Sequence, residues 1–332
     1  MTAVLVTGAT GFIGRHVAQE FLGAGYEVVA LVRSGSEGTA PTGCRFVVGD
    51  VCDRLAVRRA AEGCEAIIHV AGKYSLARHA KREVIRTNVG GTATVIAVAR
   101  ATGANLVYTS SVATMGIRAD GLPGDEDTPL RHRQTVGAYK RSKVDAERLV
   151  AQAATAGVWA TIVNPTAPVG PGDVRPTPTG RIIRDALAGR MFGYVDTGLN
   201  LVDVRDVAAG HRLALERGVS GRRYILGHAE GNLRLRDIFA AVAEISGRPA
   251  PRLRIPVSVA MALCALDELV EGTILRREPF APLDGARMAR TPMFFSPSRA
   301  IGELGLPQSS VRDAIEASVD WFRRGAQEVA VS

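Results

Sequence analysis

The sequence lacks the features that would place it in a membrane or outside the cell. No apolar run reaches eighteen residues, so no transmembrane helix is expected among its 332 residues. The first eight residues contain no basic segment and already reach glycine, unlike a secretory signal peptide. The 4 cysteines form no CxxC pair or disulfide framework, and the 6 histidines form no HExxH or HxH pattern. We therefore expect a cytoplasmic protein without a metal site.

Lysine and aromatic residues are also scarce, which bears on the unusual charge. The net charge is +8 and the pI is near 9.7, yet lysine occurs only at positions 73, 81, 140 and 143 among 41 basic residues. An arginine excess of this kind, with abundant Ala, Gly and Val, is typical of a GC-rich coding sequence. The basic residues are scattered and aromatic residues make up only 5%, which is poor material for stacking on bases. We expect no nucleic-acid partner.

The first half of the chain alternates between strand and helix patterns. Short apolar runs predict buried strands at 3–6, 27–32, 45–48, 66–70, 106–108 and 160–163. Helical spacing of apolar residues predicts helices at 12–22, 54–62, 89–102 and 138–155. Alternation with short loops predicts an α/β fold, a Rossmann-type doubly wound parallel sheet covered on both faces.

The pattern changes after Asn164. Five prolines between positions 165 and 178 predict neither helix nor strand there. Helices are predicted at 181–189, from 206 onward, and at 235–246, 258–271 and 309–323, and strands at 200–204 and 224–226. We expect a Rossmann domain over 1–165 and a smaller, mostly helical cap over 166–332, with 200–227 returning to the sheet. The apolar 258–271 segment is interpreted as a core helix.

A glycine-rich turn follows the first strand and opens the first helix. This is the context that a dinucleotide-binding motif requires, and here the segment reads TGATGFIG over residues 7–14. Gly8 permits the tight turn, Gly11 lets a diphosphate approach the backbone, and Gly14 lets helix and strand pack closely. The helix N-terminus then offers N–H groups to the diphosphate. The segment therefore predicts an NAD(P) site.

The end of the second strand indicates which dinucleotide is bound. Binding of NAD usually requires an acidic residue there, which holds the ribose 2′-hydroxyl. The strand instead ends at Val32 and is followed by Arg33. Arg33 is placed to meet a 2′-phosphate, so we predict NADP(H), with NAD as the weaker alternative. A surface arginine without this role is the other interpretation.

Asp50 and Val51 follow the third strand, where such folds bind the adenine ring. Both are therefore predicted to belong to the cofactor site. Asp50 has an alternative role as the N-cap of the next helix, although Asp53 is better placed for that.

A tyrosine and a lysine stand four residues apart in a predicted helix. Tyr139 and Lys143 therefore share one helical face, about 5–6 Å apart. A nearby ammonium favours the phenolate and is expected to lower the tyrosine pKa from ~10, which would make Tyr139 a general acid/base for a hydroxyl/carbonyl pair. A chance pair on an amphipathic helix is the alternative.

Hydroxyl groups follow the strand that precedes this helix. Ser110 and Ser111 come directly after Thr109, at the strand end where open α/β sheets bind their ligands. A serine there can hydrogen-bond the reacting oxygen beside Tyr139. Ordinary turn chemistry is the alternative for both serines.

Taken together, these motifs resemble the extended short-chain dehydrogenase/reductases of the NAD-dependent epimerase/dehydratase and dihydroflavonol-reductase-like group. The resemblance covers the whole chain. It is carried by the glycine motif and by the segments GDV (49–51), HVAG (69–72), NVGGT (88–92), TSS (109–111) and YKRSK (139–143).

Within that group the chain most resembles the hopanoid-associated sugar epimerases. The narrower matches are SSVATMG (110–116) with RADG (118–121), VNPTAPVGPGD (163–173), PTPTGR (176–181), YVDTGLN (194–200), and RMAR (287–290) before MFF (293–295). One departure falls at Asp203, where relatives usually carry a histidine.

The resemblance implies a site and a partner. The catalytic residues would be Ser111, Tyr139 and Lys143, with Asn88 supporting the proton relay. The cofactor set would be Gly8, Thr10, Gly11, Phe12, Ile13, Gly14, Arg33, Asp50, Val51, Val70, Ala71, Gly72, Thr109, Tyr139, Lys143 and Pro165. The family's homodimer would pair the 89–102 and 138–155 helices.

The reaction predicted from these residues is NADP(H)-dependent hydride transfer at a secondary hydroxyl or carbonyl. Two alternatives stay open, a redox-neutral NAD-dependent nucleotide-sugar epimerase and a non-catalytic dinucleotide sensor. The 4,6-dehydratase reaction is disfavoured because Val112 and Ala113 replace an Asp-Glu pair. Candidate anion clamps for a phosphate-bearing substrate are Arg175, Arg181 and Arg205. An isoprenoid-derived substrate would allow peripheral contact with the inner face of the membrane.

Overall fold

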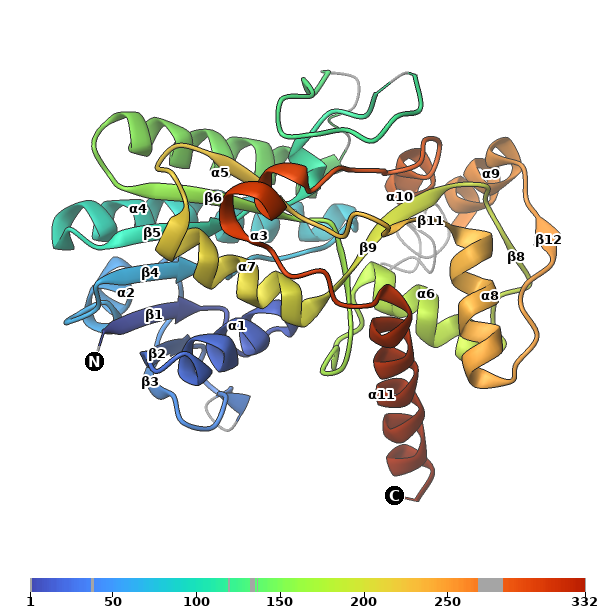
Figure 1. Ribbon diagram of the computed structural model, residues 1–332, viewed down its shortest axis with the longest axis horizontal. Coiled ribbons are helices and arrows are strands. Elements are labelled where there is room, and N and C mark those ends of the chain that lie inside the picture. Colours follow the sequence, from blue (N-terminus) through green and yellow to red (C-terminus); the bar gives the residue numbers. More distant parts are fainter. Residues whose placement is uncertain are drawn as a thin grey trace.

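The core of the fold is a seven-stranded parallel sheet (Figure 1). The computed structural model describes residues 2–36, 39–118, 120–131, 135, 137–267 and 283–331. The strands are β1 (Ala3–Thr7), β2 (Glu27–Val32), β3 (Arg45–Val48), β4 (Ala66–His69), β5 (Asn105–Thr109), β6 (Ala160–Pro165) and β10 (Arg223–Leu226). Their order is β10-β6-β5-β4-β1-β2-β3, with every pair parallel. The predicted α/β fold is confirmed.

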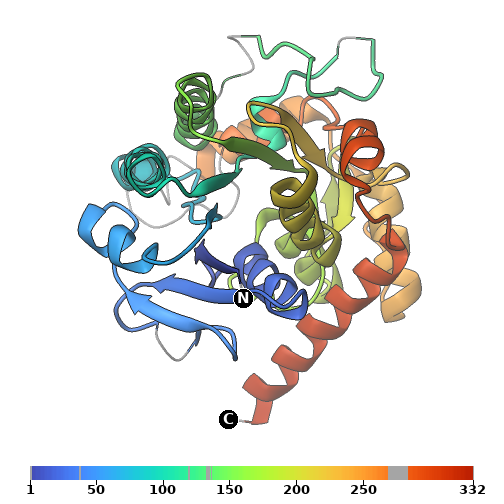
Figure 2. The ribbon, with the colours of Figure 1, turned by 60° about the vertical axis from the view of Figure 1, so that its left-hand side comes forward.

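Helices cover both faces of this sheet. On one face lie α1 (Phe12–Gly23) and α7 (Val204–Arg217), and on the other α2 (Arg54–Ala60), α4 (Gly91–Thr102) and α5 (Gly137–Thr155) (Figure 2). Alternate residues of β1 enter the two cores, since Val4 and Val6 pack on the α1 side and Leu5 on the α2 side. Burial on both faces explains why these strands read as uninterrupted apolar runs.

The strand order reverses at β1. β1 pairs with β2 on one side and with β4 on the other, so the loops that leave the carboxyl ends of β1 and β4 diverge. In open α/β sheets, ligands bind at this reversal of strand order. The predicted site residues therefore lie at or near one edge of the sheet.

A second, three-stranded sheet lies beside the main one. It consists of β11 (Asn232–Arg234), β9 (Gly198–Asp203) and β7 (Ala167–Val169), in that order. Its core is shared with α6 (Pro178–Leu187), α8 (Leu235–Ser246) and α11 (Val311–Val331). The 200–227 segment serves both sheets, because β9 belongs to the small sheet while α7 and β10 pack on the main one.

The prediction that the proline-rich segment forms neither strand nor helix is wrong at three of its prolines, the first of which, Pro165, ends β6. Pro168 lies within β7, which pairs with β9 at the edge of the small sheet, a place where the missing N–H of proline is tolerated. Pro178 occupies the first turn of α6, and the Thr177 hydroxyl caps that helix by accepting from the Gly180 N–H at 3.1 Å. Proline is favoured at this position because that N–H would be unpaired in any case.

Short elements complete the chain. They are η2 (Arg78–Ala80), α3 (Lys81–Ile85), the π-helical turn η3 (Arg86–Gly90), η4 (Val112–Thr114), β8 (Gly193–Tyr194), β12 (Leu253–Arg254), α9 (Val257–Asp267), α10 (Leu283–Met288) and the π-helical turn η7 (Ala300–Leu304). None of the helices in the described ranges is long and apolar enough to cross a membrane.

The predicted 258–271 core helix differs from the helix found. α9 covers 257–267, and the remainder of the prediction lies outside the described residues. Only Cys264 is buried within it, whereas Val259, Leu263 and Leu266 are 47%, 52% and 59% exposed. These three residues have helical spacing, so they form one exposed apolar stripe. Apolar composition alone could not distinguish this surface helix from a core helix.

Candidate active site

The glycine turn has the geometry that its motif predicts. Gly8 has φ +76°, and a Cβ added there would lie 2.7 Å from backbone atoms of Ala71. A Cβ on Gly14 would collide with the Gly8 carbonyl, whereas one on Gly11 would only approach that carbonyl to 3.3 Å. Gly8 and Gly14 are therefore required by packing within the protein, and Gly11 is exposed.

The start of α1 suits an anionic ligand. Gly11 is the N-cap and supplies no side-chain hydrogen bond, and the first turn contains no acidic residue. N–H groups at an uncapped helix N-terminus bind diphosphates readily. Thr10, Phe12 and Ile13 are half-buried around this turn. The turn therefore fits the diphosphate of a dinucleotide.

Arg33 lies exposed directly after β2, as predicted. Its charge reaches Glu83 of α3, whose pKa is lowered mainly by a hydrogen bond from Lys73 and to a smaller extent by Arg33. Glu83 is paired with Lys73 at 2.5 Å. Arg33 thus stands at the carboxyl end of the sheet.

Asp50 has local partners after β3. Its Oδ1 accepts from the Cys52 N–H at 2.8 Å, and its Oδ2 accepts from Arg86 at 3.3 Å. The Cys52 hydrogen bond is the main reason why the Asp50 pKa is lowered. Asp53 caps α2, as expected. Val51 is buried, and its side chain would contact any Cβ added to Gly91.

A buried histidine network positions the loop after β4. His69 Nδ1 hydrogen-bonds Thr7 Oγ1 at 2.7 Å and His69 Nε2 hydrogen-bonds Thr92 Oγ1 at 3.1 Å, while the Ala71 N–H donates to Thr7 Oγ1 at 3.2 Å. Burial, with a smaller effect from Lys143, lowers the pKa of His69 to about 3. A neutral His69 therefore ties β1 and β4 together, which holds the half-buried Val70 and Ala71 beside the glycine turn.

Asn88 lies in the π-helical turn η3 and is buried. Its Nδ2 donates to Ser142 Oγ at 2.9 Å and to the Lys73 carbonyl at 3.0 Å, and its Oδ1 accepts from the Lys73 N–H at 2.7 Å. A Cβ on Gly72 would lie 3.4 Å from Lys143 Nζ and 3.5 Å from Asn88 Oδ1. The structure therefore brings Asn88, Gly72 and Lys143 together. Isolated π-turns of this kind are frequent at functional sites.

Tyr139, Ser111 and Lys143 converge at the carboxyl end of β5. Tyr139 lies in the first turn of α5, with its ring against that of Tyr74 at 4.6 Å. Lys143, one turn further, is buried and its Nζ donates to the Thr109 carbonyl at 2.8 Å. The ammonium also lies 5.3 Å from the centre of the Tyr108 ring.

The pKa of Tyr139 differs from the predicted direction. Burial raises it, and the opposing effect is a hydrogen bond with Ser111. Burial also lowers the pKa of Lys143 to about 8. Helical spacing places the two residues on one face, but Lys143 donates its hydrogen bond to the Thr109 carbonyl and the phenol is desolvated.

Sequence reasoning missed Glu147, which is one further turn along the same face of α5. It is 7% exposed. Its Oε2 accepts hydrogen bonds from Ser110 Oγ at 2.5 Å, Thr114 Oγ1 at 2.7 Å and Asn164 Nδ2 at 2.9 Å. Its Oε1 accepts from Arg223 at 3.3 Å. Its spacing of eight residues from Tyr139 was visible in the sequence, but its partners on other elements were not.

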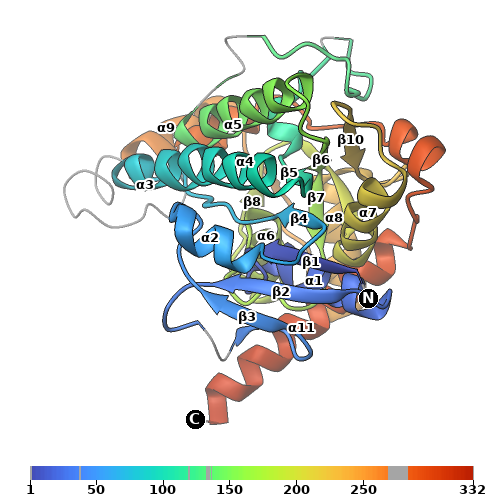
Figure 3. The same cartoon turned by 90° about the vertical axis from the view of Figure 1, so that its left-hand side faces the viewer.

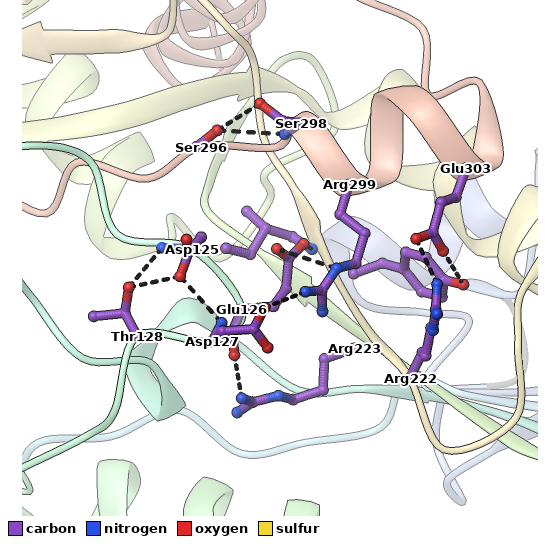
Figure 4. Close-up of polar contacts among 12 residues, drawn as sticks. Asp125, Glu126, Asp127, Thr128, Arg222, Arg223, Ser296, Ser298, Arg299 and Glu303 are labelled. Carbon is purple, nitrogen blue, oxygen red and sulfur yellow. Dashed lines mark hydrogen bonds and ion pairs between the residues drawn. The ribbon is translucent and has the colours of Figure 1, made fainter.

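Arg223 connects this carboxylate to a charged cluster at the surface (Figure 4). Its guanidinium also donates to the Glu126 carbonyl, and the Glu126 carboxylate accepts from the Ile225 N–H at 2.8 Å. Arg299 pairs with Asp127, and Arg222 pairs with Glu303, each at 2.5 Å. A depression of about 420 Å³ lies among these residues. Its charges are balanced in pairs, so it does not favour an anionic ligand.

Two of the remaining candidates have structural roles. Asp203 is buried and caps α7 by accepting from the Arg205 N–H at 2.7 Å, and it pairs with the Arg205 guanidinium at 2.5 Å. Arg205 is thus engaged within the chain, although its side chain stays 58% exposed. Arg175 is exposed and Arg181 half-buried. Pro165 is buried at the end of β6, at the same sheet edge as Thr109.

A Rossmann sheet with a glycine turn and a Ser-Tyr-Lys group defines an extended short-chain dehydrogenase/reductase. Over residues 4–227 the chain matches the sequence model of the NAD dependent epimerase/dehydratase family. The chain belongs to that family, and it is an NAD(P)-dependent enzyme of the short-chain dehydrogenase/reductase class. The resemblance to the extended short-chain dehydrogenase/reductases is confirmed, and the non-catalytic alternative is set aside.

Relatives match nearly end to end. A candidate dihydroflavonol 4-reductase of Synechocystis sp. is 42% identical, with 96% of this chain and 94% of that protein covered. Sterol demethylase protein B of Methylococcus capsulatus is 34% identical, with 96% and 98% covered. Among solved structures, the crystal structure of gox2253 superposes with a TM-score of 0.86 at 38% identity, covering 98% of this chain and 99% of that one.

Proposed function

We propose that the protein is an NADP(H)-dependent oxidoreductase that reduces a carbonyl, or oxidises a secondary hydroxyl, with Tyr139 as the general acid or base. The observation that carries this proposal is the convergence of Tyr139, Ser111 and Lys143 at the sheet edge that also holds the glycine turn. A dinucleotide bound along the edge would supply or accept the hydride.

The side chains divide the remaining work. Tyr139 gives its phenolic proton to the carbonyl oxygen, or takes it back in the reverse direction. Ser111, which lies just after β5 and lowers the Tyr139 pKa against the effect of burial, orients the same oxygen. Lys143 supplies positive charge next to the reacting group, and its position beside Gly72 suits a hydrogen bond to a ribose hydroxyl. Asn88 hydrogen-bonds the Lys73 backbone and Ser142, and thereby fixes the position of these two residues relative to each other.

The preference for NADP(H) rests on Arg33. The guanidinium is exposed where β2 ends, and the two residues directly after that strand, Arg33 and Ser34, carry no carboxylate. Arginine binds phosphate through paired, charge-assisted hydrogen bonds. Asp50 contributes on the adenine side while it stays bound to Cys52 and Arg86.

Net reduction is proposed over sugar epimerisation. NADP(H) suits an enzyme that exchanges its cofactor each turnover, and the two named relatives are described by a reductase activity and a sterol substrate. These names, with the resemblance to hopanoid-associated sugar epimerases, favour a lipophilic polycyclic substrate from an isoprenoid. A nucleotide sugar is the second candidate, but Arg205, one of its proposed anion clamps, is paired with Asp203.

We further propose a homodimer and a peripheral location. The helices α4 and α5 lie side by side on the outer surface (Figure 3), where a second copy would pair with them. The protein would be cytoplasmic, and the apolar stripe of α9 would lie on the anionic inner face of the cell membrane. Charge complementarity supports this partner, because Arg248 and Arg252 are exposed ahead of α9, while Arg254 pairs with Asp196 and Asp267 ends the helix.

The test is oxidation of NADPH with a panel of carbonyl compounds that includes a dihydroflavonol, a sterol ketone and a UDP-4-ketosugar. The proposal expects stoichiometric loss of reduced nicotinamide with a lipophilic ketone. Interconversion of UDP-glucose and UDP-galactose with no net change in nicotinamide would instead establish the epimerase alternative.

A further inference from the structure

We propose that Glu147 is a positioning residue that fixes the serine turn after β5 and keeps the Lys143 side chain charged. The proposal rests on the proposed roles of Ser111, Tyr139 and Lys143. It concerns a buried carboxylate that does not touch the reacting atoms.

The first observation is how Glu147 holds the turn. Ser110 and Thr114 flank Ser111, and both donate to Glu147 Oε2, at 2.5 and 2.7 Å. Asn164 donates to the same oxygen at 2.9 Å and also to the Ser111 carbonyl at 3.1 Å. Ser111 therefore lies between groups that share one anchor. Loss of that anchor would let the Ser111 hydroxyl move relative to Tyr139.

The second observation is that the set of partners favours an ionised carboxylate. The partners of Glu147 are two hydroxyls, the Asn164 amide and the Arg223 guanidinium. The two hydroxyls can also accept, but the Asn164 Nδ2 and the Arg223 guanidinium only donate, and each carboxylate oxygen of Glu147 accepts from one of them. Arg223 offsets the charge from the far side. Glu147 is thus a fixed negative charge inside the protein.

The third observation is the position of Lys143, one helical turn before Glu147. Burial lowers the pKa of Lys143 to about 8, and Glu147 opposes that effect. Other groups facing the ammonium are Tyr139 on α5, the Tyr108 ring on β5, His69 on β4, and His211 of α7 through Thr109. Burial lowers the pKa values of His69 and His211 to about 3 and about 4, so both are neutral.

The small number of lysines makes it possible to test the effect of the Glu147 charge on Lys143 by NMR. The chain contains four lysines, so a protein labelled with 13C at lysine Cε gives few NMR signals. Lys140 is an internal control, since burial alone lowers its pKa to about 8 as well. Lys140→Arg and Lys143→Arg assign the two signals by their disappearance. No substrate is needed, so this readout does not depend on the proposed reaction.

In Glu147→Gln we expect the titration midpoint of Lys143 to move to lower pH while that of Lys140 stays in place. Removal of a negative charge destabilises the ammonium, which then loses its proton earlier as pH rises. An unchanged Lys143 midpoint in a folded Glu147→Gln protein would overturn the charge role. A purely structural role predicts that unchanged midpoint.

Turnover tests the positioning role separately. Thr114→Val removes one donor to Glu147 and leaves the charge in place, so we expect kcat to fall about tenfold with the KM for NADPH and the Lys143 midpoint unchanged. An unchanged kcat would overturn the positioning role, even if Glu147→Gln failed to fold. Full activity of Tyr139→Phe would instead defeat the proposed function and leave the NMR result on Glu147 standing.

Discussion

The carboxyl edge of the main sheet and the α9 end of the cap differ in which side chains are buried. The first buries polar side chains, and the second exposes apolar ones. At the edge, buried polar groups meet partners from distant elements, as His69 does with Thr7 and Thr92. At α9, apolar side chains such as Leu263 and Leu266 face outward. Buried polar groups are costly unless paired, and exposed apolar stripes usually mark a contact surface. The first region is thus organised for chemistry and the second for contact.

The largest effect that separates the two regions is expected from Lys143→Met. Removal of the ammonium from the edge should lower turnover about a thousandfold, because Tyr139 loses its charged neighbour. Steady-state kinetics with the ketone identified in the panel measures this. Leu263→Ser on α9 is the control and should keep wild-type turnover in solution. Equal losses of turnover in both variants would contradict the assignment of chemistry to the sheet edge and of contact to α9.

Two glycines of the turn at the carboxyl edge are expected to have different roles, one in folding and one in cofactor binding. Gly14→Ala should destabilise folding by about 3 kcal/mol, since its methyl group collides with the Gly8 carbonyl. Gly11→Ala should fold with nearly wild-type stability, because its Cβ only approaches that carbonyl to 3.3 Å, yet bind NADPH weakly. Denaturant unfolding and fluorescence titration separate the outcomes. Similar stabilities for the two variants would contradict the assigned roles.

How much of this division is visible in the sequence differs between the regions. Uninterrupted apolar runs predicted the strands of the main sheet closely, with β2 and β3 at the predicted bounds, because burial on both faces leaves a strong pattern. Spacing also predicted that Tyr139 and Lys143 share a face. Glu147 was missed because its partner Arg223 lies 76 residues away, and no local pattern encodes that contact.

The cap was harder to predict for a related reason. Pro168 lies in a strand only because β7 is at an edge, and that is a property of the assembled sheet. The α9 segment is apolar on every side, so its sequence does not distinguish a core helix from a surface helix. Which apolar residues are covered depends on neighbours that are distant in sequence.

A smaller effect is expected from Arg33→Gln. Loss of one charge-assisted contact to the 2′-phosphate should weaken NADPH binding about tenfold and leave NADH binding unchanged. Fluorescence titration of both reduced cofactors measures this directly. Arg175→Gln, which alters an exposed arginine of the cap, is the matched control. Tighter binding of NADH than NADPH by the wild type would refute the role of Arg33.

The smallest effect concerns α9. Leu263→Ser with Leu266→Ser should reduce binding to phosphatidylglycerol vesicles roughly tenfold, since two apolar side chains no longer enter the lipid. Co-sedimentation measures the bound fraction, with phosphatidylcholine vesicles as the control for charge. Leu55→Ser, which alters an apolar residue that is 71% exposed on α2, should bind as the wild type does. Loss of dimers in place of lipid binding would identify the stripe as a subunit contact.

The most direct test of the central claim is Tyr139→Phe, which removes one oxygen from the site. We predict that the variant binds NADPH with wild-type affinity by fluorescence titration and loses hydride transfer to the ketone that the wild type reduces. Turnover by Tyr139→Phe at the wild-type rate would contradict the account, because the proton would then come from another group.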